Sequence, residues 1–240
     1  MFENDFSSIV STPNFPECEP WMKLHELKKE KEVVGIYLSA HPLDDFRPAM
    51  KHFCNTKLGV LNDLDLLINR ELNIGGMIGE VDHRVSSNGK GWAIFSLEDY
   101  EESFEFRIFG EEYLKFRHFL SVDNFVYMKT SVREGWLNNE TGRRGDPRLV
   151  FKSFQQLQDV LALNTKKITL SIDNNRLDDN LLDYFKKLFK KYKGNHKLEM
   201  SFYDEKDEIR LLMPSRKIKV DVNENFLHDL ENSLIDYKLN

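Results

Sequence analysis

The chain is poor in cysteine, has no long apolar run and carries no excess of positive charge. Its 240 residues include 2 cysteines, Cys18 and Cys54. They form no CxxC pair, so neither a disulfide framework nor a structural zinc site is expected, and both thiols are predicted to be reduced. No apolar stretch approaches the roughly 18 residues of a membrane-spanning helix, and residues 1–8 are acidic and mixed, unlike a signal peptide. These absences predict a cytoplasmic protein without a membrane partner.

The charge is acidic overall and changes along the chain. The net charge is −6, and residues 1–70 carry 8 Lys or Arg and 11 Asp or Glu, residues 71–158 carry 11 and 14, and residues 159–240 carry 15 and 15. No segment is basic as a whole. Because phosphate contacts dominate nucleic-acid affinity, we expect any nucleic acid to bind weakly and through a local patch.

No set of catalytic or cofactor-binding residues is recognisable. The sequence has no P-loop, no supported Ser/His/Asp or Cys/His set, and no carboxylate pair on one strand face for two-metal chemistry. We therefore expect no catalytic residues, no metal and no cofactor in this chain. The apolar content of 40% and aromatic content of 12% are sufficient for one large or two small cores.

The first regular element is predicted to be an amphipathic helix. Leu27, Val34 and Leu38 recur at helical spacing, which predicts a helix from Trp21 to about Ser39. The pair His41-Pro42 is expected to end it, because proline cannot donate a backbone hydrogen bond and disfavours the helical conformation of the residue before it. A histidine at this position is most often a helix cap, so it predicts no chemistry.

The middle segment, residues 71–158, has the alternation of a small β-barrel. Leu72, Ile74 and Ile78 share one parity and later apolar residues take the other, which predicts a bulge or sharp coil near Gly79. An order of three strands, a helix and two strands is typical of the five-stranded OB-fold. The expected strands are 72–85, 92–98, 104–108, 125–134 and 148–154, with the helix at 111–119.

OB-folds commonly bind single-stranded nucleic acid across their second and third strands, with aromatic platforms for bases and cations for phosphates. The hairpin between those strands is acidic here, so a nucleic acid strand is expected to favour the other rim. The alternative is a structural barrel whose outward aromatic residues pack against flanking domains. The candidate nucleic-acid-binding residues are Trp92, Arg107, Tyr127, Lys129 and Arg133 in an outward row, with Arg143 and Arg144 in the loop before the last strand.

The last segment, residues 159–240, is predicted to be a small α+β domain. Four lysines lie beside the apolar stripe of its first helix, which is most often a solvated face; an anionic partner is the sharper alternative. Gly194 is expected to end this helix. The expected elements are strands 168–172, 197–203 and 208–213, an extended piece 217–222, and helices 178–192 and 224–234.

Two motifs resemble a known family. The run Gly35-Ile36-Tyr37-Leu38-Ser39-Ala40-His41-Pro42-Leu43 follows a Lys/Glu-rich helix, and Cys18-Glu19-Pro20-Trp21 precedes that helix. Both resemble the C-terminal third of bacterial replicative DNA polymerase III alpha subunits. The order of the later segments fits as well, so the resemblance covers almost the whole chain.

The resemblance implies an α+β multi-domain fragment of a DNA-directed DNA polymerase that does no chemistry itself, because the family's catalytic Asp motif lies upstream. Its implied partners are single-stranded template DNA, the tau subunit of the clamp loader and, through a peptide of which only Met1-Phe2 remains, the sliding clamp. The implied domains are a linker with this remnant (residues 1–20), a helical segment at the end of the polymerase fingers and clamp-binding region (21–70), the OB-fold (71–158) and a tau-binding domain (159–240).

Two other functions remain open at this point. An anticodon-binding OB domain of a class II tRNA synthetase has a similar strand pattern, although a helix ending at His41-Pro42 has no place there. A purely structural interaction module without nucleic-acid contact is the second. Binding of single-stranded DNA would separate the replication reading from the structural one.

Overall fold

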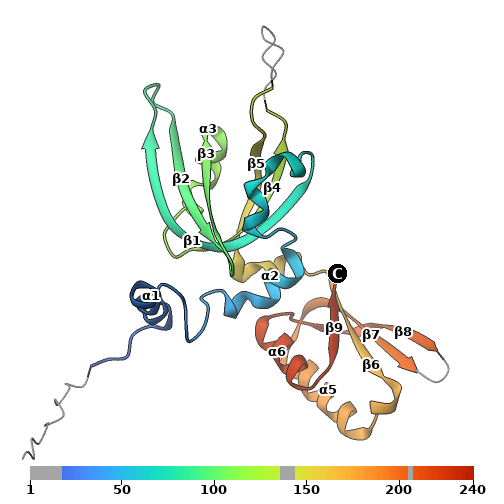
Figure 1. Ribbon diagram of the computed structural model, residues 1–240. Coiled ribbons are helices and arrows are strands. Elements are labelled where there is room, and N and C mark those ends of the chain that lie inside the picture. The colour runs from blue at the N-terminus through green and yellow to red at the C-terminus, as the bar shows by residue number, and fades with distance from the viewer. Residues whose placement is uncertain (1–17, 136–143, 205–207) are drawn as a thin grey trace, which may run out of the picture. The chain divides into compact units, whose positions relative to one another are not determined.

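The computed structural model describes residues 18–135, 144–204 and 208–240. The fold is α+β, with a five-stranded sheet and a four-stranded sheet, as the elements in Figure 1 show. The chain divides into two compact units, Met1–Pro42 and Leu43–Asn240. Both sheets belong to the second unit.

The first unit contains one helix, α1 (Lys23–Val34), within its described residues. Gly35 ends the helix in the left-handed conformation (φ 90°), and its N–H donates to the carbonyl of Lys31 at 2.8 Å. Beyond it, the Glu30 carboxylate accepts hydrogen bonds from the backbone N–H of Leu38 at 3.2 Å and of Ser39 at 3.0 Å. The predicted helix end at Ser39 is therefore wrong, because glycine adopts this cap without steric cost and Glu30 then holds the following loop.

The second unit begins with short helical elements, and those of residues 58–67 pack into the core of the five-stranded sheet. Leu58 and Leu61 are each 1% exposed and belong to that core. The core therefore starts earlier in the chain than the expected domain border after residue 70. The elements are η1 (Asp44–Phe46), α2 (Arg47–Phe53), η2 (Leu58–Asn62) and η3 (Leu64–Leu67).

The five-stranded sheet has the order β3-β2-β1-β4-β5, and every neighbouring pair is antiparallel. In Figure 1, β1 bends so that β2 and β3 lie on one side of it and β4 and β5 on the other. The register of β1 against β2 shifts between Ile78 and Val81, which confirms the predicted bulge near Gly79. The strands are β1 (Glu71–Val85), β2 (Gly91–Glu98), β3 (Ser103–Phe109), β4 (Phe125–Arg133) and β5 (Arg148–Gln156).

The predicted strands and their helix, α3 (Gly110–Phe116) continued by η4 (Arg117–Phe119), are confirmed, but the sheet is not closed. Within the described residues, β3 and β5 remain edge strands and do not pair with each other. The interior is filled by aromatic rings: Phe95 lies 5.2 Å from Phe106 and 6.2 Å from Phe151, between ring centroids. These rings hold the two halves of the bent sheet together around one core.

The four-stranded sheet has the order β8-β7-β6-β9, with β6 and β7 parallel and the other pairs antiparallel. The parallel pair is connected by α5, as a parallel pair requires a crossover. The segment between β5 and β6 is helical and packed, since Val160 there is fully buried. The elements are η5 (Leu157–Asp159), α4 (Val160–Asn164), β6 (Lys167–Asp173), η6 (Asn174–Arg176), α5 (Asp179–Lys191), β7 (Lys193–Asp204), β8 (Ile209–Val220), α6 (Glu224–Asn232) and β9 (Asp236–Leu239).

Three predictions for this sheet need correction. The pieces expected at 208–213 and 217–222 form one strand, β8, and β9 was not predicted. Gly194 does not end α5; it lies in β7, where a Cβ would come within 2.5 Å of the backbone N of Asp221. A glycine is needed there for close approach of two backbones.

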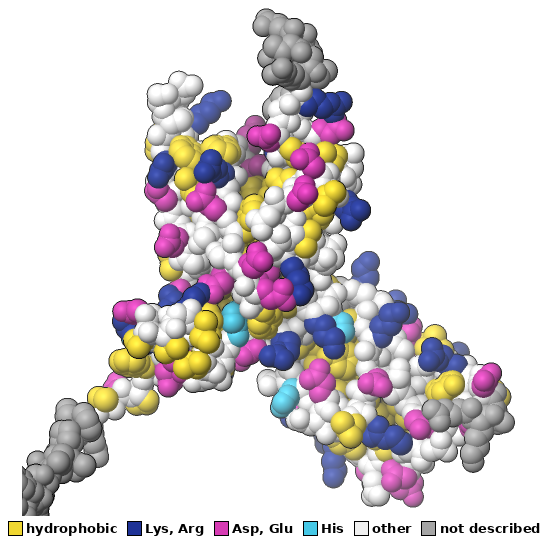
Figure 2. Space-filling view, in the orientation of Figure 1, with side chains coloured by type: hydrophobic (Ala, Val, Ile, Leu, Met, Phe, Trp, Pro, Cys, Tyr) yellow, Lys and Arg dark blue, Asp and Glu magenta, His cyan; other side chains and the backbone are white. Residues whose placement is uncertain are grey.

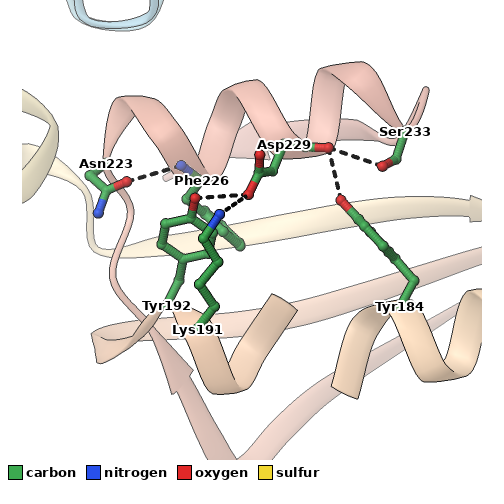
Figure 3. A network of polar contacts seen from close by, with 7 residues as sticks. All are labelled: Tyr184, Lys191, Tyr192, Asn223, Phe226, Asp229 and Ser233. Carbon is green, nitrogen blue, oxygen red and sulfur yellow. Dashed lines mark hydrogen bonds and ion pairs between the residues drawn. The ribbon is translucent and has the colours of Figure 1, made fainter. Parts of the chain in front are cut away.

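A polar network joins α5 to α6 (Figure 3). The carboxylate of Asp229 on α6 accepts hydrogen bonds from Lys191 Nζ and from the Tyr192 hydroxyl, both at 2.8 Å. The carbonyl of Asp229 accepts from the Tyr184 hydroxyl at 2.8 Å. Asn223 caps α6 by accepting from the N–H of Phe226 at 2.9 Å. The two helices are therefore held side by side over one face of the sheet.

Candidate nucleic-acid interface

The open side of the five-stranded sheet forms a groove of about 760 Å³ between the edges β3 and β5. Three arginines from three strands line it: Arg107 on β3, Arg133 at the end of β4 and Arg148 at the start of β5. The failure of β3 and β5 to pair leaves these side chains around one depression. We call it the arginine groove.

Carboxylates offset part of this positive charge. Glu105, Glu111 and Glu112 also line the arginine groove, and Arg107 pairs with Glu105 at 3.0 Å. Burial raises the pKa of Glu112, although its carboxylate accepts a hydrogen bond from the N–H of Phe151 at 3.2 Å. The arrangement suits a weakly bound anion better than a tightly bound one.

An aromatic row adjoins the arginine groove. Arg84, Trp92 and Phe109 are direct cross-strand neighbours on β1, β2 and β3. The rings of Trp92 and Phe109 stack at 5.3 Å with 17° between their planes, and the Arg84 guanidinium lies 5.4 Å from the Trp92 ring. Phe109 is 55% exposed and also lines the groove. The row therefore offers a flat surface on which a base can stack, next to cations that can contact phosphate.

The structure brings together Arg107 and Arg133 of the predicted patch, with half-buried Trp92 connected to them through Phe109. Lys129 is exposed on β4 but is not among the residues that line the groove. Arg144 is exposed and forms an ion pair with Glu134. Arg143 lies outside the described residues.

The predicted exposure of Tyr127 is wrong. Tyr127 as a whole is only 2% exposed, and its hydroxyl donates to the carbonyl of Phe53, at the end of α2, at 3.4 Å. Burial, with a smaller contribution from Cys54, raises the pKa of Tyr127 to about 12. The side chain does lie on the outer face of β4, but α2 covers that face, so Tyr127 offers no platform to a base.

Sequence reasoning missed Arg84, Phe109 and Arg148. Arg148 begins the predicted last strand, directly after the loop that contains Arg143 and Arg144, so the sequence could have included it in the predicted patch. Arg84 and Phe109 matter only because the strand register places them on either side of Trp92. Register of this kind is a property of the assembled sheet.

The acidic hairpin between β2 and β3 has a structural role. Asp99 is 7% exposed, and its carboxylate accepts three backbone N–H hydrogen bonds, from Leu58, Glu101 and Glu102, each at 2.8 Å. Glu101 forms an ion pair with Lys57. The hairpin thereby holds η2 against the sheet, at the acidic end of the strands that carry the aromatic row.

The wider surface has mixed charge. On the face drawn in Figure 2, Lys and Arg side chains are interspersed with Asp and Glu. In the described part of the chain, no cluster of three or more His, Cys, Asp or Glu side chains has the arrangement of a metal site.

None of the helices that the structure describes is both long and apolar enough to cross a membrane.

The amino-acid sequence of this chain matches those of known proteins along most of its length. Residues 168–240 match the family described as DNA polymerase III alpha subunit, C-terminal domain. Three similar proteins are DNA polymerase III alpha subunits. That of Saccharopolyspora erythraea is 25% identical over 205 residues, which cover 82% of this chain and 16% of the relative. That of Chlamydia muridarum is 26% identical over 252 residues, 89% of this chain and 20% of the relative. That of Rickettsia conorii is 31% identical over 147 residues, which cover 59% of this chain and 11% of the relative.

These matches confirm the resemblance of this chain to DNA polymerase III alpha subunits, and its last segment matches their C-terminal domain. The chain spans a fifth or less of the length of these relatives.

Proposed function

We propose that this chain is the non-catalytic C-terminal part of a bacterial replicative DNA polymerase III alpha subunit and acts in DNA replication. In this proposal the five-stranded sheet is an OB-type domain that guides single-stranded template DNA. The four-stranded domain docks the tau subunit of the clamp loader. Met1-Phe2, the residues predicted to contact the sliding clamp, lie outside the described part of the chain.

Support for the OB-type domain comes from strand order and from the bend of β1. The sequence of three strands, a helix and two strands, with a bulged first strand shared by both halves of the sheet, is the connectivity of OB-folds. The open edges β3 and β5 depart from a closed barrel. They also create the arginine groove.

The observation that carries the single-strand proposal is the position of Phe109. It stacks on Trp92 and lines the arginine groove, so one continuous surface offers a base platform and phosphate contacts. Single-strand binding without sequence preference combines these two elements. A duplex would present its stacked bases edge-on and gain nothing from the platform.

The test is a fluorescence anisotropy titration of the full chain with a labelled oligothymidylate and with a duplex of the same length, at low and moderate salt. The variant Trp92→Ala/Arg107→Glu/Arg133→Glu is expected to weaken single-strand binding at least about tenfold, since it removes a stacking platform and reverses two phosphate-facing charges. The control Lys115→Glu/Arg117→Glu carries the same two reversals at exposed positions of α3 and η4 that do not line the groove. Equal binding by wild type and variant, or no binding at low salt, contradicts the proposal.

The docking role has its own test. Deletion of residues 166–240 is expected to abolish binding to the tau subunit in a pull-down, while single-strand binding by the remaining chain is retained. Retention of DNA binding shows that the shortened chain is folded. Unchanged tau binding after the deletion would overturn this part of the proposal.

A further inference from the structure

The sheet of the C-terminal domain has one strand that its helices leave uncovered. In the register of the sheet, Leu170 of β6 lies beside Met200 of β7, which lies beside Met213 of β8. These three side chains therefore share a face. Leu170 is fully buried, whereas Met213 is 50% exposed. The helices α5 and α6 therefore cover this apolar face of the sheet at β6 and leave it uncovered at β8.

A groove of about 610 Å³ lies where this coverage stops, between α5 and the β7–β8 pair. Its walls are apolar. Leu182 and Ile218, from opposite sides, are 43% and 44% exposed, and the rings of Phe185 and Phe189 stack at 5.3 Å along α5. The apolar lining residues are Leu182, Phe185, Phe189, Met200 and Ile218.

Among the residues that the structure describes, every charged residue that lines this groove is a lysine. They are Lys186, Lys190, Lys193, Lys217 and Lys219. Lys186 pairs with Asp183 at 2.8 Å. For the other four, no ion pair is present among the described residues. We call the site the lysine-rimmed groove.

We propose that the lysine-rimmed groove binds an acidic amphipathic helix of a partner protein. Charge complementarity selects the occupant: the floor needs apolar side chains on one face of the ligand, and the rim needs carboxylates on both sides of that face. A helix with apolar residues at i, i+3, i+4 and i+7 and with flanking Glu or Asp meets both needs. It would lie beside α5 and cover β8.

Single-stranded DNA fits this groove less well than it fits the arginine groove. The floor has three aliphatic and two aromatic side chains, and of the two stacked rings Phe185 is 4% exposed and Phe189 is half-buried. Among the described residues of the rim there is lysine but no arginine. Base stacking needs accessible aromatic faces, and bidentate phosphate contacts need arginine. The proposal deepens the docking role of the C-terminal domain and rests on it for the biological setting. The binding of an acidic helix itself depends only on the residues that line the groove.

The experiment uses the full chain and a fluorescein-labelled synthetic peptide of about five helical turns, with Leu at i, i+3, i+4 and i+7 and Glu on both flanks. Anisotropy at low salt is expected to show saturable binding. A peptide of the same composition in scrambled order should not bind. The groove variant Lys190→Glu/Lys217→Glu is expected to weaken binding about tenfold or more, because two rim attractions become repulsions.

The matched control is Lys187→Glu/Lys238→Glu, which makes the same change in net charge at exposed lysines outside the groove. It is expected to bind the acidic peptide within about twofold of wild type. A second peptide, with Lys in place of Glu, should bind the groove variant better than it binds wild type. This charge exchange also shows that the groove variant is folded.

Three results would overturn the proposal: no binding of the acidic peptide, equal weakening by the groove and control variants, or displacement of the peptide from the groove by oligothymidylate with higher affinity. The tau pull-down distinguishes the two proposals. In one outcome, deletion of residues 166–240 abolishes tau binding, but the groove variant binds both the peptide and tau as wild type does. The docking proposal then stands and the groove proposal fails. If the peptide binds the groove and tau does not bind the chain, the groove proposal stands and the tau assignment fails.

Discussion

The two sheets of this chain differ in how they bury their apolar faces. The five-stranded sheet bends around its own aromatic rings, so its open edge exposes arginines, carboxylates and one aromatic row. The four-stranded sheet stays open, and on the face that α5 and α6 partly cover, Leu211 and Met213 of β8 are 55% and 50% exposed. The first buries its apolar face within its own core and exposes charged groups at its open edge. The second has an apolar surface that a partner can cover.

This difference separates two kinds of cation. The arginines of the first groove lie among carboxylates that hold them in place, as Glu105 holds Arg107. The lysines of the second groove surround apolar residues and, Lys186 excepted, have no ion pair in the part of the chain that the structure describes. Local composition predicts cations in both segments. Only the residues around these cations, carboxylates in the first groove and apolar side chains in the second, distinguish the two proposed ligands, a single nucleic-acid strand and an amphipathic helix.

The largest expected effect tests whether the two sheets have separate cores. Phe95→Ala on β2 and Phe226→Ala on α6 each remove a ring that is at most 1% exposed, the first from the core of the five-stranded sheet and the second from the helix that covers the four-stranded sheet. Each should lower the free energy of unfolding by about 3 to 5 kcal/mol. The core of the five-stranded sheet includes no residue of the four-stranded sheet, so hydrogen exchange should rise mainly in the sheet that carries the substitution. Equal loss of protection in both sheets would show one cooperative unit.

Asp99 tests how far the first sheet depends on its acidic hairpin. Asp99→Ala leaves the N–H groups of Leu58, Glu101 and Glu102 without their acceptor. Chemical denaturation should show a loss of about 2 kcal/mol, the usual range for hydrogen bonds to a charged group. Asp99→Asn keeps one acceptor oxygen and should lose less. If Asp99→Ala is neutral, the hairpin does not hold η2 against the sheet.

Tyr192 tests the network between the helices that cover the second sheet. Tyr192→Phe removes the hydroxyl that donates to Asp229 and should cost about 1 kcal/mol at neutral pH. Hydrogen bonds from Lys191 and Tyr192 hold the pKa of Asp229 below its ordinary 3.8. This stabilisation is present above the ordinary pKa and is lost as the pH falls through the lowered one, so the difference from wild type should shrink in strong acid. Tyr203→Phe, outside the network, is the control; an equal effect there would exclude the assigned role.

The smallest expected effect concerns the carboxylate inside the arginine groove. Burial raises the pKa of Glu112, so protonation favours the folded state, and this contribution is lost as the pH rises through the raised pKa. Glu112→Gln retains an acceptor for the Phe151 N–H and is neutral at every pH. It should be more stable than wild type by less than about 1 kcal/mol at pH 7, with no difference below about pH 4. A constant difference across this range, measured by thermal unfolding, would contradict the titration of Glu112.

Much of the fold was predictable because its signals are local. Alternation of apolar residues located all five strands of the first sheet, and the change of parity located the bulge between Ile78 and Val81. Helical spacing located α5, and Asp178 caps it by accepting from the N–H of Leu181 at 2.7 Å. Each of these depends on residues a few positions apart, which the sequence lists together.

The candidate site depended on residues that the sequence keeps far apart. Tyr127 has the parity of an outward residue, yet α2 returns over that face and buries it. Trp92 gained its neighbours Arg84 and Phe109 from strand register. The predicted helix end at Ser39 failed for a more local reason, since Gly35 adopts the left-handed cap before His41-Pro42 is reached.

By itself, the sequence determined most of the elements and their order, the acidic charge and the resemblance to DNA polymerase III alpha subunits, because periodicity and motif spacing depend only on the order of residues along the chain. Tertiary structure alone decided that β3 and β5 stay apart to form the arginine groove, and that α5 and α6 stop short of β8. The physical reason is that burial depends on which distant segment covers a face. An amphipathic pattern shows that a face is apolar, and only packing shows whether the protein covers it itself.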